Sequence, residues 1–192
     1  MTKYIFAISV AVFALTPAVS AECVRGSEKG LRVSWTAFKT PAKVGVKGYL
    51  RGLKSKGPKK ADSWQELVLG QTLNLASDAT SVDSKNKPRD AKIAKFFFSK
   101  MKGQIQAKVT KINETKKLMT LSVTMNGKTL DNVSMAFTRE DDVLKASGHI
   151  DILDFAADKA LASINKACAA LHKGKTWSHV EIGFDAKFKS CK

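Results

Sequence analysis

Residues 121–137, LSVTMNGKTLDNVSMAF, carry the strongest structural signal in the chain. Apolar and polar side chains alternate on both sides of Asn126 and Gly127, and a period of two is typical of a β-strand with one buried face. Asn-Gly is typical of a type I′ turn, which needs a positive φ at both central positions. The segment therefore predicts a β-hairpin.

The same alternation recurs on either side of this hairpin and predicts eight strands in all. Eight strands, of which the last four are nearly contiguous, indicate a mainly β protein with an antiparallel barrel or sandwich. An eight-stranded barrel either fills with side chains or holds one small ligand. The expected strands are residues 31–37, 44–46, 71–77, 103–112 and 117–126, one containing Val133, Met135 and Phe137, one from Leu144 to Ile152, and residues 178–189.

Helical signals interrupt the strands. Residues 156–172 predict one long helix, because four apolar residues fall on one stripe at helical spacing. One or two short helices are also expected, at 63–69 behind a Ser-x-x-Glu capping box and at 89–98 behind Pro88. The stripe of the long helix consists of Leu161, Ile164, Cys168 and Leu171.

The N-terminus is typical of a secretory signal peptide. Lys3 precedes a short apolar run, and small residues lead to a predicted cleavage site after Ala21. We therefore expect residues 1–21 to be removed and residues 22–192 to form one domain in the periplasm or outside the cell.

The chain is strongly basic. It has 33 Lys and Arg against 17 Asp and Glu, a net charge of +16, of which the expected signal peptide contributes only Lys3. Such a charge attracts anionic partners. The lysines are not interleaved with aromatic residues on one face, which disfavours nucleic acid. An anionic membrane surface is the more natural partner, and a merely solvated cationic face is the alternative.

No catalytic or metal-binding arrangement is recognisable. The chain has no G-x-S-x-G motif, and its three histidines do not form a convincing set of zinc ligands. We therefore expect neither an enzyme nor a cofactor. The histidines are His149, His172 and His179.

Three segments together resemble the YceI family. They are SVDSKNKPRDAKIAKFFF at 81–98, LSVTMNGKTLDNVSMAF at 121–137, and the stretch from ASGHIDILDF to FDAKF at 146–188. The resemblance covers about residues 31–189. It implies a lipocalin-like barrel of eight antiparallel strands that binds a polyisoprenoid or another long amphiphile without covalent attachment.

This resemblance leads to a non-catalytic lipid carrier as the expected function. The alternative is a cationic surface protein with a filled barrel that binds anionic lipid or polymer. The two differ in whether the interior is hollow. The sequence leaves the lipid's identity and the oligomeric state open, a homodimer included.

The Phe run at 96–98 is the expected entrance, since its three rings cannot all face one core. Ile93, Phe96 and Phe97 would pack on the barrel and Phe98 would line the entrance; alternatively, all three rings plug the barrel end. Arg89 and Asp90 are either a polar anchor for a head group or local charges at a helix start. The methionines either line the pocket or fill the core. The candidate ligand-binding residues are Trp35, Asn86, Arg89, Asp90, Phe96, Phe97, Phe98, Met119, Met125, Met135 and Phe155.

Three cysteines follow the expected signal peptide, so at most two pair with each other. Cys168 lies on the apolar stripe of the long helix, where a thiol behaves as a small hydrophobic group. Cys23 and Cys191 flank the first and last strands, which are neighbours in a closed barrel. We predict a Cys23–Cys191 disulfide, with Cys168–Cys191 as the rival pairing.

Overall fold

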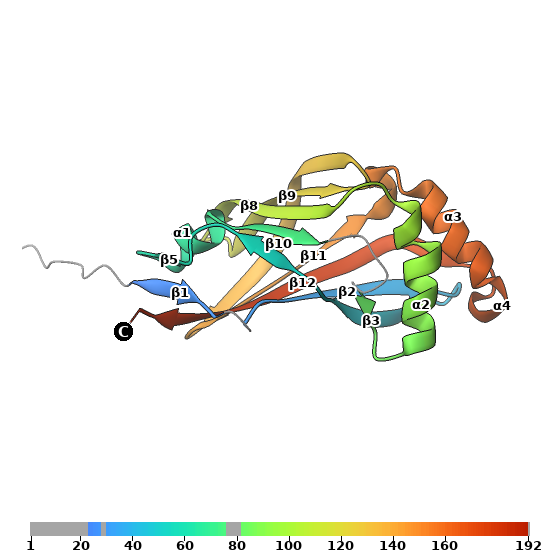
Figure 1. Cartoon of the computed structure of the whole chain (residues 1–192), viewed down its shortest axis with the longest axis horizontal. Helices are drawn as coiled ribbons and strands as arrows, with labels where there is room; N and C mark the ends of the chain where they lie inside the picture. Colours follow the sequence, from blue (N-terminus) through green and yellow to red (C-terminus); the bar gives the residue numbers. More distant parts are fainter. Residues whose placement is uncertain (1–22, 28–29, 76–81, 192) are drawn as a thin grey trace, which may run out of the picture.

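The computed structural model describes residues 23–27, 30–75 and 82–191, which form a curled antiparallel sheet with helices at both ends (Figure 1). The strands are β1 (Val24–Gly26), β2 (Arg32–Lys39), β3 (Val44–Leu50), β4 (Lys54–Lys56), β5 (Lys60–Ala61), β6 (Thr72–Leu75), β7 (Val82–Asp83), β8 (Ile105–Asn113), β9 (Leu118–Met125), β10 (Lys128–Glu140), β11 (Val143–Asp151) and β12 (Thr176–Ser190). The helices are α1 (Trp64–Leu69), α2 (Lys87–Phe96), α3 (Asp158–Ala167) and α4 (Ala169–His172), with 3₁₀ turns η1 (Phe98–Lys100) and η2 (Ile152–Phe155).

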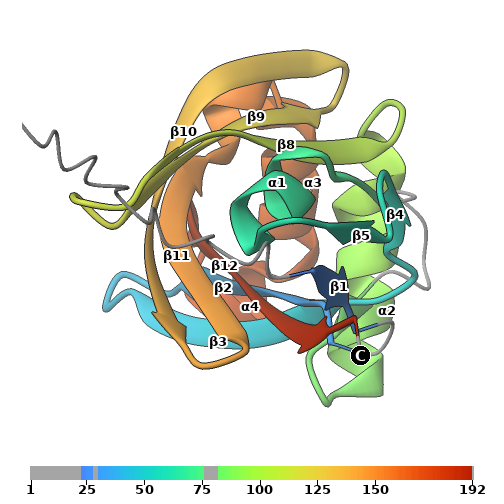
Figure 2. The same cartoon turned by 90° about the vertical axis from the view of Figure 1, so that its left-hand side faces the viewer.

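The strands follow the order β4-β6-β8-β9-β10-β11-β12-β2-β3-β7, and β1 pairs with β12 and β5. Seen along the long axis, they surround α1, which lies across one end (Figure 2). The expected mainly β, barrel-like fold is confirmed, and the eight predicted strands correspond to β2, β3, β6 and β8 to β12. Among the described residues, the hydrogen-bonded path ends at β4 and β7, so the barrel is curled without a continuous closing ladder.

The four short strands β1, β4, β5 and β7 were not predicted. The segment 51–60, RGLKSKGPKK, contains β4, and β5 begins at its last residue. Backbone pairing holds β4, with Lys54 opposite Asn74 and Lys56 opposite Thr72. Such lysine-rich pieces have no apolar alternation, so the periodicity of the sequence could not reveal them.

The hairpin at Asn126 and Gly127 is confirmed, since both residues have a positive φ (53° and 77°) between β9 and β10. The Asn126 side chain also joins this turn to two other segments. Its amide donates hydrogen bonds to the carbonyl oxygens of Phe155 (3.1 Å) and Ala156 (2.8 Å), and its oxygen accepts one from the Lys102 amide (2.9 Å).

The long helix predicted at 156–172 is wrong in its extent. It is replaced by α3 and α4, which are separated at Cys168, where the backbone leaves helical geometry (φ −115°, ψ 11°). The burial of the apolar stripe changes across this break. Ile164 and Cys168 are buried, but Leu171 is 62% exposed.

The other two predicted helices are present. Ser63 caps α1 by accepting a hydrogen bond from the Glu66 amide (3.2 Å), as the capping box indicated. Asn86 caps α2 in the same way through the Arg89 amide (3.0 Å), and Pro88 stands in the first turn of that helix. Each cap fixes where its helix begins.

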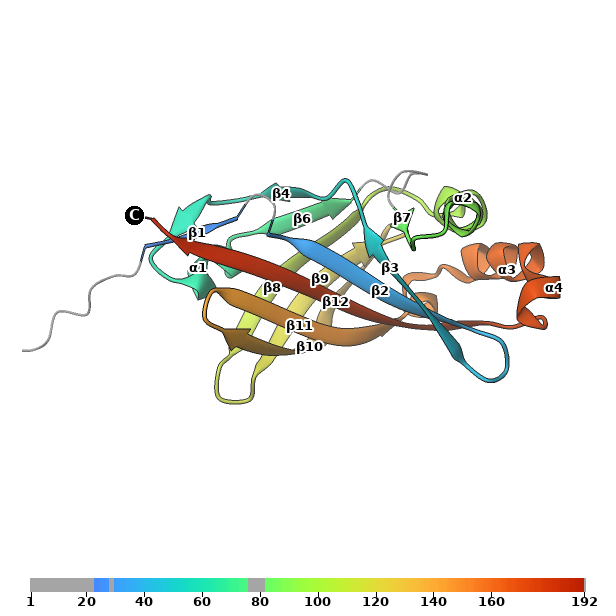
Figure 3. The ribbon, with the colours of Figure 1, turned by 90° about the horizontal axis from the view of Figure 1, so that it is seen from below.

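The Cys23–Cys191 disulfide is confirmed, with Cα atoms 5.3 Å apart, and Cys168 is a free, buried cysteine. The bridge lies beyond the pairing of β1 with the end of β12. Figure 3 shows β12 running from α4 to this end of the molecule, while α2, α3 and α4 gather at the other. The expected signal peptide at 1–21 lies outside the described residues.

Candidate ligand-binding cavity

The barrel walls differ in how completely their inward side chains are covered. On β9 and β10 most of these side chains are buried, as at Leu121, Val123 and Met135. On β2, β3 and β12 several apolar side chains that pack against the core stay only half-buried. A close-packed interior would bury these side chains completely, so an open space borders this wall. The half-buried residues are Trp35, Leu50, Val180, Ile182, Phe184 and Ala186.

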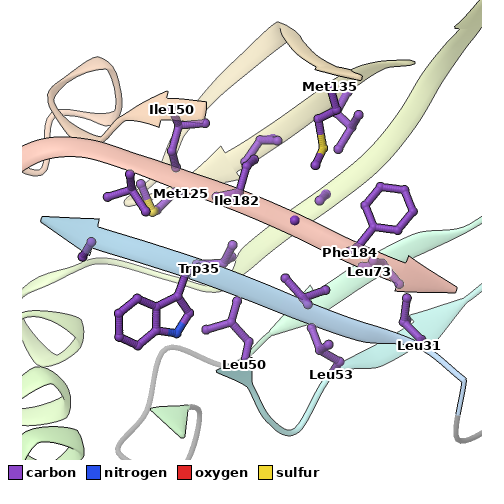
Figure 4. A pocket seen from close by; sticks show the side chains of 18 of the residues that line it. Leu31, Trp35, Leu50, Leu53, Leu73, Met125, Met135, Ile150, Ile182 and Phe184 are labelled. Carbon is purple, nitrogen blue, oxygen red and sulfur yellow. The ribbon is translucent and has the colours of Figure 1, made fainter. Parts of the chain in front are cut away.

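The space is a cavity of about 1370 Å³ inside the barrel. Its lining is mainly apolar, with side chains from opposite walls around it (Figure 4). Both Thr176 and Lys189 of β12 line it. At about 3.3 Å per strand residue, the cavity therefore follows the strand for roughly 40 Å. It exceeds the roughly 300–1,000 Å³ of a pocket for a drug-sized molecule, and its shape suits a long, thin ligand.

At the end that carries β1, helix α1 covers the barrel. Trp64 is buried there, with ring centroids 5.8 Å from Phe137 and 6.3 Å from Phe188. Leu67 and Val68 of the same helix line the cavity. Helix α1 therefore covers this end of the cavity with apolar side chains.

At the other end, α2 and α3 supply the apolar lining. Ile93 of α2 and Leu161 and Ile164 of α3 border the cavity. Phe97 and Phe98 line it too, with their rings edge to face at a centroid distance of 5.4 Å. The end of the barrel that carries α2, α3 and α4, which we call the helix end, therefore surrounds the cavity with apolar side chains.

The three phenylalanines of the Phe run have different environments. Phe98 is buried, Phe97 is half-buried, and both border the cavity. Within the described residues, Phe96 belongs neither to the core cluster nor to the cavity lining; the Lys95 ammonium lies 5.4 Å from its ring centroid. Helix α2 ends at Phe96, and the backbone change at Phe97 (φ −116°) ends the helical spacing on which the expected stripe depended.

Arg89 and Asp90 both form hydrogen bonds with the buried residue Ser84. Arg89 donates from Nε to Ser84 Oγ and from Nη2 to the Ser84 carbonyl, each at 2.7 Å. Asp90 accepts from the Ser84 amide at 2.9 Å and from its hydroxyl. Asp90 does not line the cavity, whereas Arg89 does. The pair thus fixes the loop that precedes α2.

An ion-pair cluster fixes the same loop to the sheet. The buried Asp83 carboxylate pairs with Arg51 and with Lys85, whose ammonium is 3.2 Å away. The hydrogen bond from Arg51, followed by that from the Lys85 amide, lowers the pKa of Asp83 to about 2. Asp83 therefore stays ionised and joins β7 to the residue after β3.

Seven of the eleven candidate ligand-binding residues line the cavity: Trp35, Asn86, Arg89, Phe97, Phe98, Met125 and Met135. The structure does not bring Asp90, Phe96, Met119 or Phe155 there. Met119 and Phe155 are completely buried in the core. The sequence interpretation also missed lining residues, among them Leu50, Leu53, Val180, Ile182, Phe184 and Leu161. For β12 the signal was available, because the alternation already placed Val180, Ile182 and Phe184 on one inward face.

Every charged side chain that lines the cavity among the described residues is basic; none is Asp or Glu. Some of these cations lie at the α1 end and others at the helix end. The basic lining residues are Arg25, Lys39, Lys59, Arg89, Lys92, Lys108, Lys187, Lys189 and the titratable His172.

The histidines on the outer surface do not form a metal site with other residues. His149 and His179 face each other across β11 and β12, with ring centroids 5.1 Å apart. Within the described ranges, no group of three His, Cys, Asp or Glu side chains is placed to hold a metal ion. None of the helices there is long and apolar enough to cross a membrane.

Two solved structures share this fold. A polyisoprenoid-binding domain from Saccharophagus degradans, implicated in plant cell wall breakdown, matches with a TM-score of 0.58 at 11% identity, covering 87% of this chain and 98% of that one. BcnA from Burkholderia cenocepacia matches with a TM-score of 0.52 at 14% identity, covering 83% and 96%. No curated protein sequence matches the chain. Residues 32–188 match the family model described as YceI-like domain, and the chain therefore belongs to the YceI-like family.

Proposed function

We propose that this protein binds a long-chain isoprenoid or another amphiphilic lipid in its cavity and carries it without chemical change. The observation that supports this most directly is the long apolar cavity of about 1370 Å³. A filled barrel, which the alternative function requires, does not fit this cavity. The polyisoprenoid-binding domain with the same fold adds support.

The energetics of burial suffice for useful affinity without special chemistry. Transfer of one methylene from water to an apolar site is worth about 0.8 kcal/mol. Ten buried carbons therefore supply roughly 8 kcal/mol, from which the cost of ordering the ligand and its side chains is subtracted. The ligand contacts that we propose from the earlier candidates are Trp35, Asn86, Arg89, Phe97, Phe98, Met125 and Met135.

The proposed location is the periplasm or the outside of the cell. The signal-like residues 1–21 support it, and so does the Cys23–Cys191 disulfide, which is typical of an oxidising compartment. An exported protein with this charge meets membranes directly.

The helix end is the proposed contact with an anionic membrane. Leu171 is exposed there and also borders the cavity. The ammonium groups of Lys43 and Lys175 lie 5.3 Å and 4.5 Å from the Trp177 ring centroid. An aromatic ring with adjacent lysines suits the boundary between head groups and lipid chains.

Native mass spectrometry of protein purified from its own host, with organic extraction of what co-purifies, tests the lipid directly. A matched pair of variants tests the cavity. Ala107→Phe places a ring on the lining of β8, and Ala136→Phe adds the same ring to the exposed face of β10. We expect Ala107→Phe to lower uptake of a lipophilic probe and Ala136→Phe to leave it unchanged. Equal uptake by both variants would contradict the proposal.

A further inference from the structure

The cations at the two ends of the cavity differ in how far they are withdrawn from water. At the end near α1, the basic lining residues are exposed to water; Lys59 and Lys189 are examples. At the helix end, Lys39, Lys92 and His172 line the cavity and are half-buried. Partial burial weakens hydration of a cation, so a counter-charge is worth more at the helix end.

No carboxylate supplies that counter-charge. Neither Lys39 nor Lys92 forms an ion pair with an acidic residue in the part of the chain that the structure describes. The neighbouring Arg89 is already engaged through two of its donors with Ser84. Lys39 and Lys92 are therefore the charged groups at the helix end that can bind an anionic group of a ligand.

The fold brings the three groups together from three elements. Lys39 is the register partner of Thr176 across β2 and β12. Thr176 Oγ1 lies 3.1 Å from Nδ1 of His172, which fixes the ring of α4 beside Lys39. Burial, and then the charges of Lys39 and of Lys92 from α2, lower the pKa of His172, so both ammonium groups act on this imidazole.

The imidazole suits the same anion. Its pKa is lowered, so the ring is neutral at pH 7. When Nδ1 accepts the Thr176 hydroxyl hydrogen, Nε2 carries the proton and is a donor. Two ammonium groups and one N–H donor at the rim of an apolar cavity match a phosphate or a carboxylate, because charge-assisted hydrogen bonds to such oxygens are strong.

We infer that the lipid of this cavity has an anionic head group, a phosphate or a carboxylate, held at the helix end by Lys39, Lys92 and His172. The inference rests on the proposed function, since it assigns the head group and the direction of the same ligand. The tail extends past Ile93 and Phe97 toward Phe184 and the α1 end. At the proposed membrane contact, the ligand then enters with its tail first and leaves with its head group first.

Three ligands with one C20 tail test the inference: geranylgeraniol, its monophosphate and the corresponding carboxylic acid. Each displaces a neutral fluorescent naphthylamine probe from delipidated protein that comprises residues 22–192. We expect at least one of the two anions to bind about tenfold or more tightly than the alcohol. If one anion binds more tightly than the other, it identifies the head group as phosphate or carboxylate. If the two anions bind equally and both more tightly than the alcohol, the anionic head group is still supported.

Matched variants locate the site. Lys39→Met/Lys92→Met removes two charges at the helix end, and Lys59→Met/Lys189→Met removes two at the α1 end. We expect the first variant to lose the preference for the anion and the second to keep it. Affinity for the alcohol is measured for each variant as the reference for folding and for the cavity, and the preference is the ratio of the anion affinity to the alcohol affinity. His172→Gln, a single uncharged replacement, lowers the preference in part.

The outcomes separate this inference from the proposed function. If none of the three ligands binds, the proposed function is wrong. If all three bind equally, the cavity binds lipid but the head-group inference is overturned. A preference that survives in Lys39→Met/Lys92→Met, or disappears in Lys59→Met/Lys189→Met, overturns the site at the helix end.

Discussion

The indole of Trp35 lies over Gly48, its register partner across β2 and β3. A Cβ at position 48 would overlap the ring, 2.6 Å from its Cε2 atom. Trp35 borders the cavity, so the absence of a side chain at Gly48 sets where the indole lies on this wall.

Gly48→Ala should therefore displace the indole and destabilise the protein by about 1–3 kcal/mol, the usual cost of overpacking. Urea denaturation measures the stability, and lipophilic probe uptake reports on the cavity. Gly45→Ala is the control on the same strand, since its Cβ would come no closer than 3.2 Å to a neighbouring atom, which is the Thr36 methyl group. Equal urea midpoints for the two variants would argue against the Trp35 contact.

Asp83→Asn should lower stability at neutral pH, because the variant loses the ion pairs with Arg51 and Lys85. The folded pKa of about 2 lies below the unfolded value of about 3.9. The contribution of Asp83 is therefore present above pH 4 and is lost as the pH falls through 2. Urea midpoints from pH 7 to pH 2 should converge for parent and variant. A constant difference over this range would contradict the assignment. Exposed Asp154→Asn is the control.

Loss of the disulfide should destabilise the protein strongly. The bridge joins residues 168 positions apart, and the chain-entropy relation assigns about 5 kcal/mol to a loop of this size. Cys23→Ser/Cys191→Ser, compared with the parent in urea, measures it. Peptide mapping without reduction should yield one linked peptide containing Cys23 and Cys191. A linked peptide containing Cys168 would refute the pairing.

Phe97→Ala should reduce probe uptake roughly five- to tenfold, because its ring supplies apolar lining at the helix end. Phe96→Ala removes an identical ring, one position earlier, that does not line the cavity, and uptake should stay close to that of the parent. Titration with a lipophilic probe compares them. Similar losses in both variants would mean that the Phe run acts only through folding.

Binding to anionic vesicles should weaken steeply with salt, since the Debye length falls from about 10 Å at 0.1 M to about 3 Å at 1 M. Lys43→Met/Lys175→Met should bind more weakly at low salt than Lys116→Met/Lys145→Met, which removes two exposed charges from outside the proposed contact. Vesicle co-sedimentation measures both. Binding that is independent of salt would exclude the electrostatic contact.

Alternation alone predicted the eight main strands and the Asn126–Gly127 turn, because a half-buried strand and a type I′ turn leave local signatures. The positions of Cys23 and Cys191 beside the first and last strands predicted the disulfide, because this prediction required only that the two strands be neighbours. The short strand β4 was not predictable, because backbone pairing alone places it. The split of the long helix at Cys168 was also missed, since the apolar spacing continues through the break to Leu171.

The site was predicted less completely than the fold. The Phe run and the Asn86–Arg89 segment were recognised as local motifs, and most of their side chains reach the cavity. Met119 and Met125 lie on one face of β9 in the sequence pattern, but only Met125 borders the cavity. The depth of a residue along a curled strand decides between core and lining, and a single-strand pattern carries no information about that depth.

The bridge between Cys23 and Cys191 determines which end of the molecule is available for attachment. The bridge lies beside β1 and the end of β12. Figure 1 shows α2, α3 and α4 at the opposite end of the molecule. A tag or reporter joined before Cys23 or after Cys191 therefore projects away from the helix end. Protein tethered through either terminus to a sensor chip presents the proposed entrance to the solution, so that ligand exchange with vesicles can be followed on immobilised molecules.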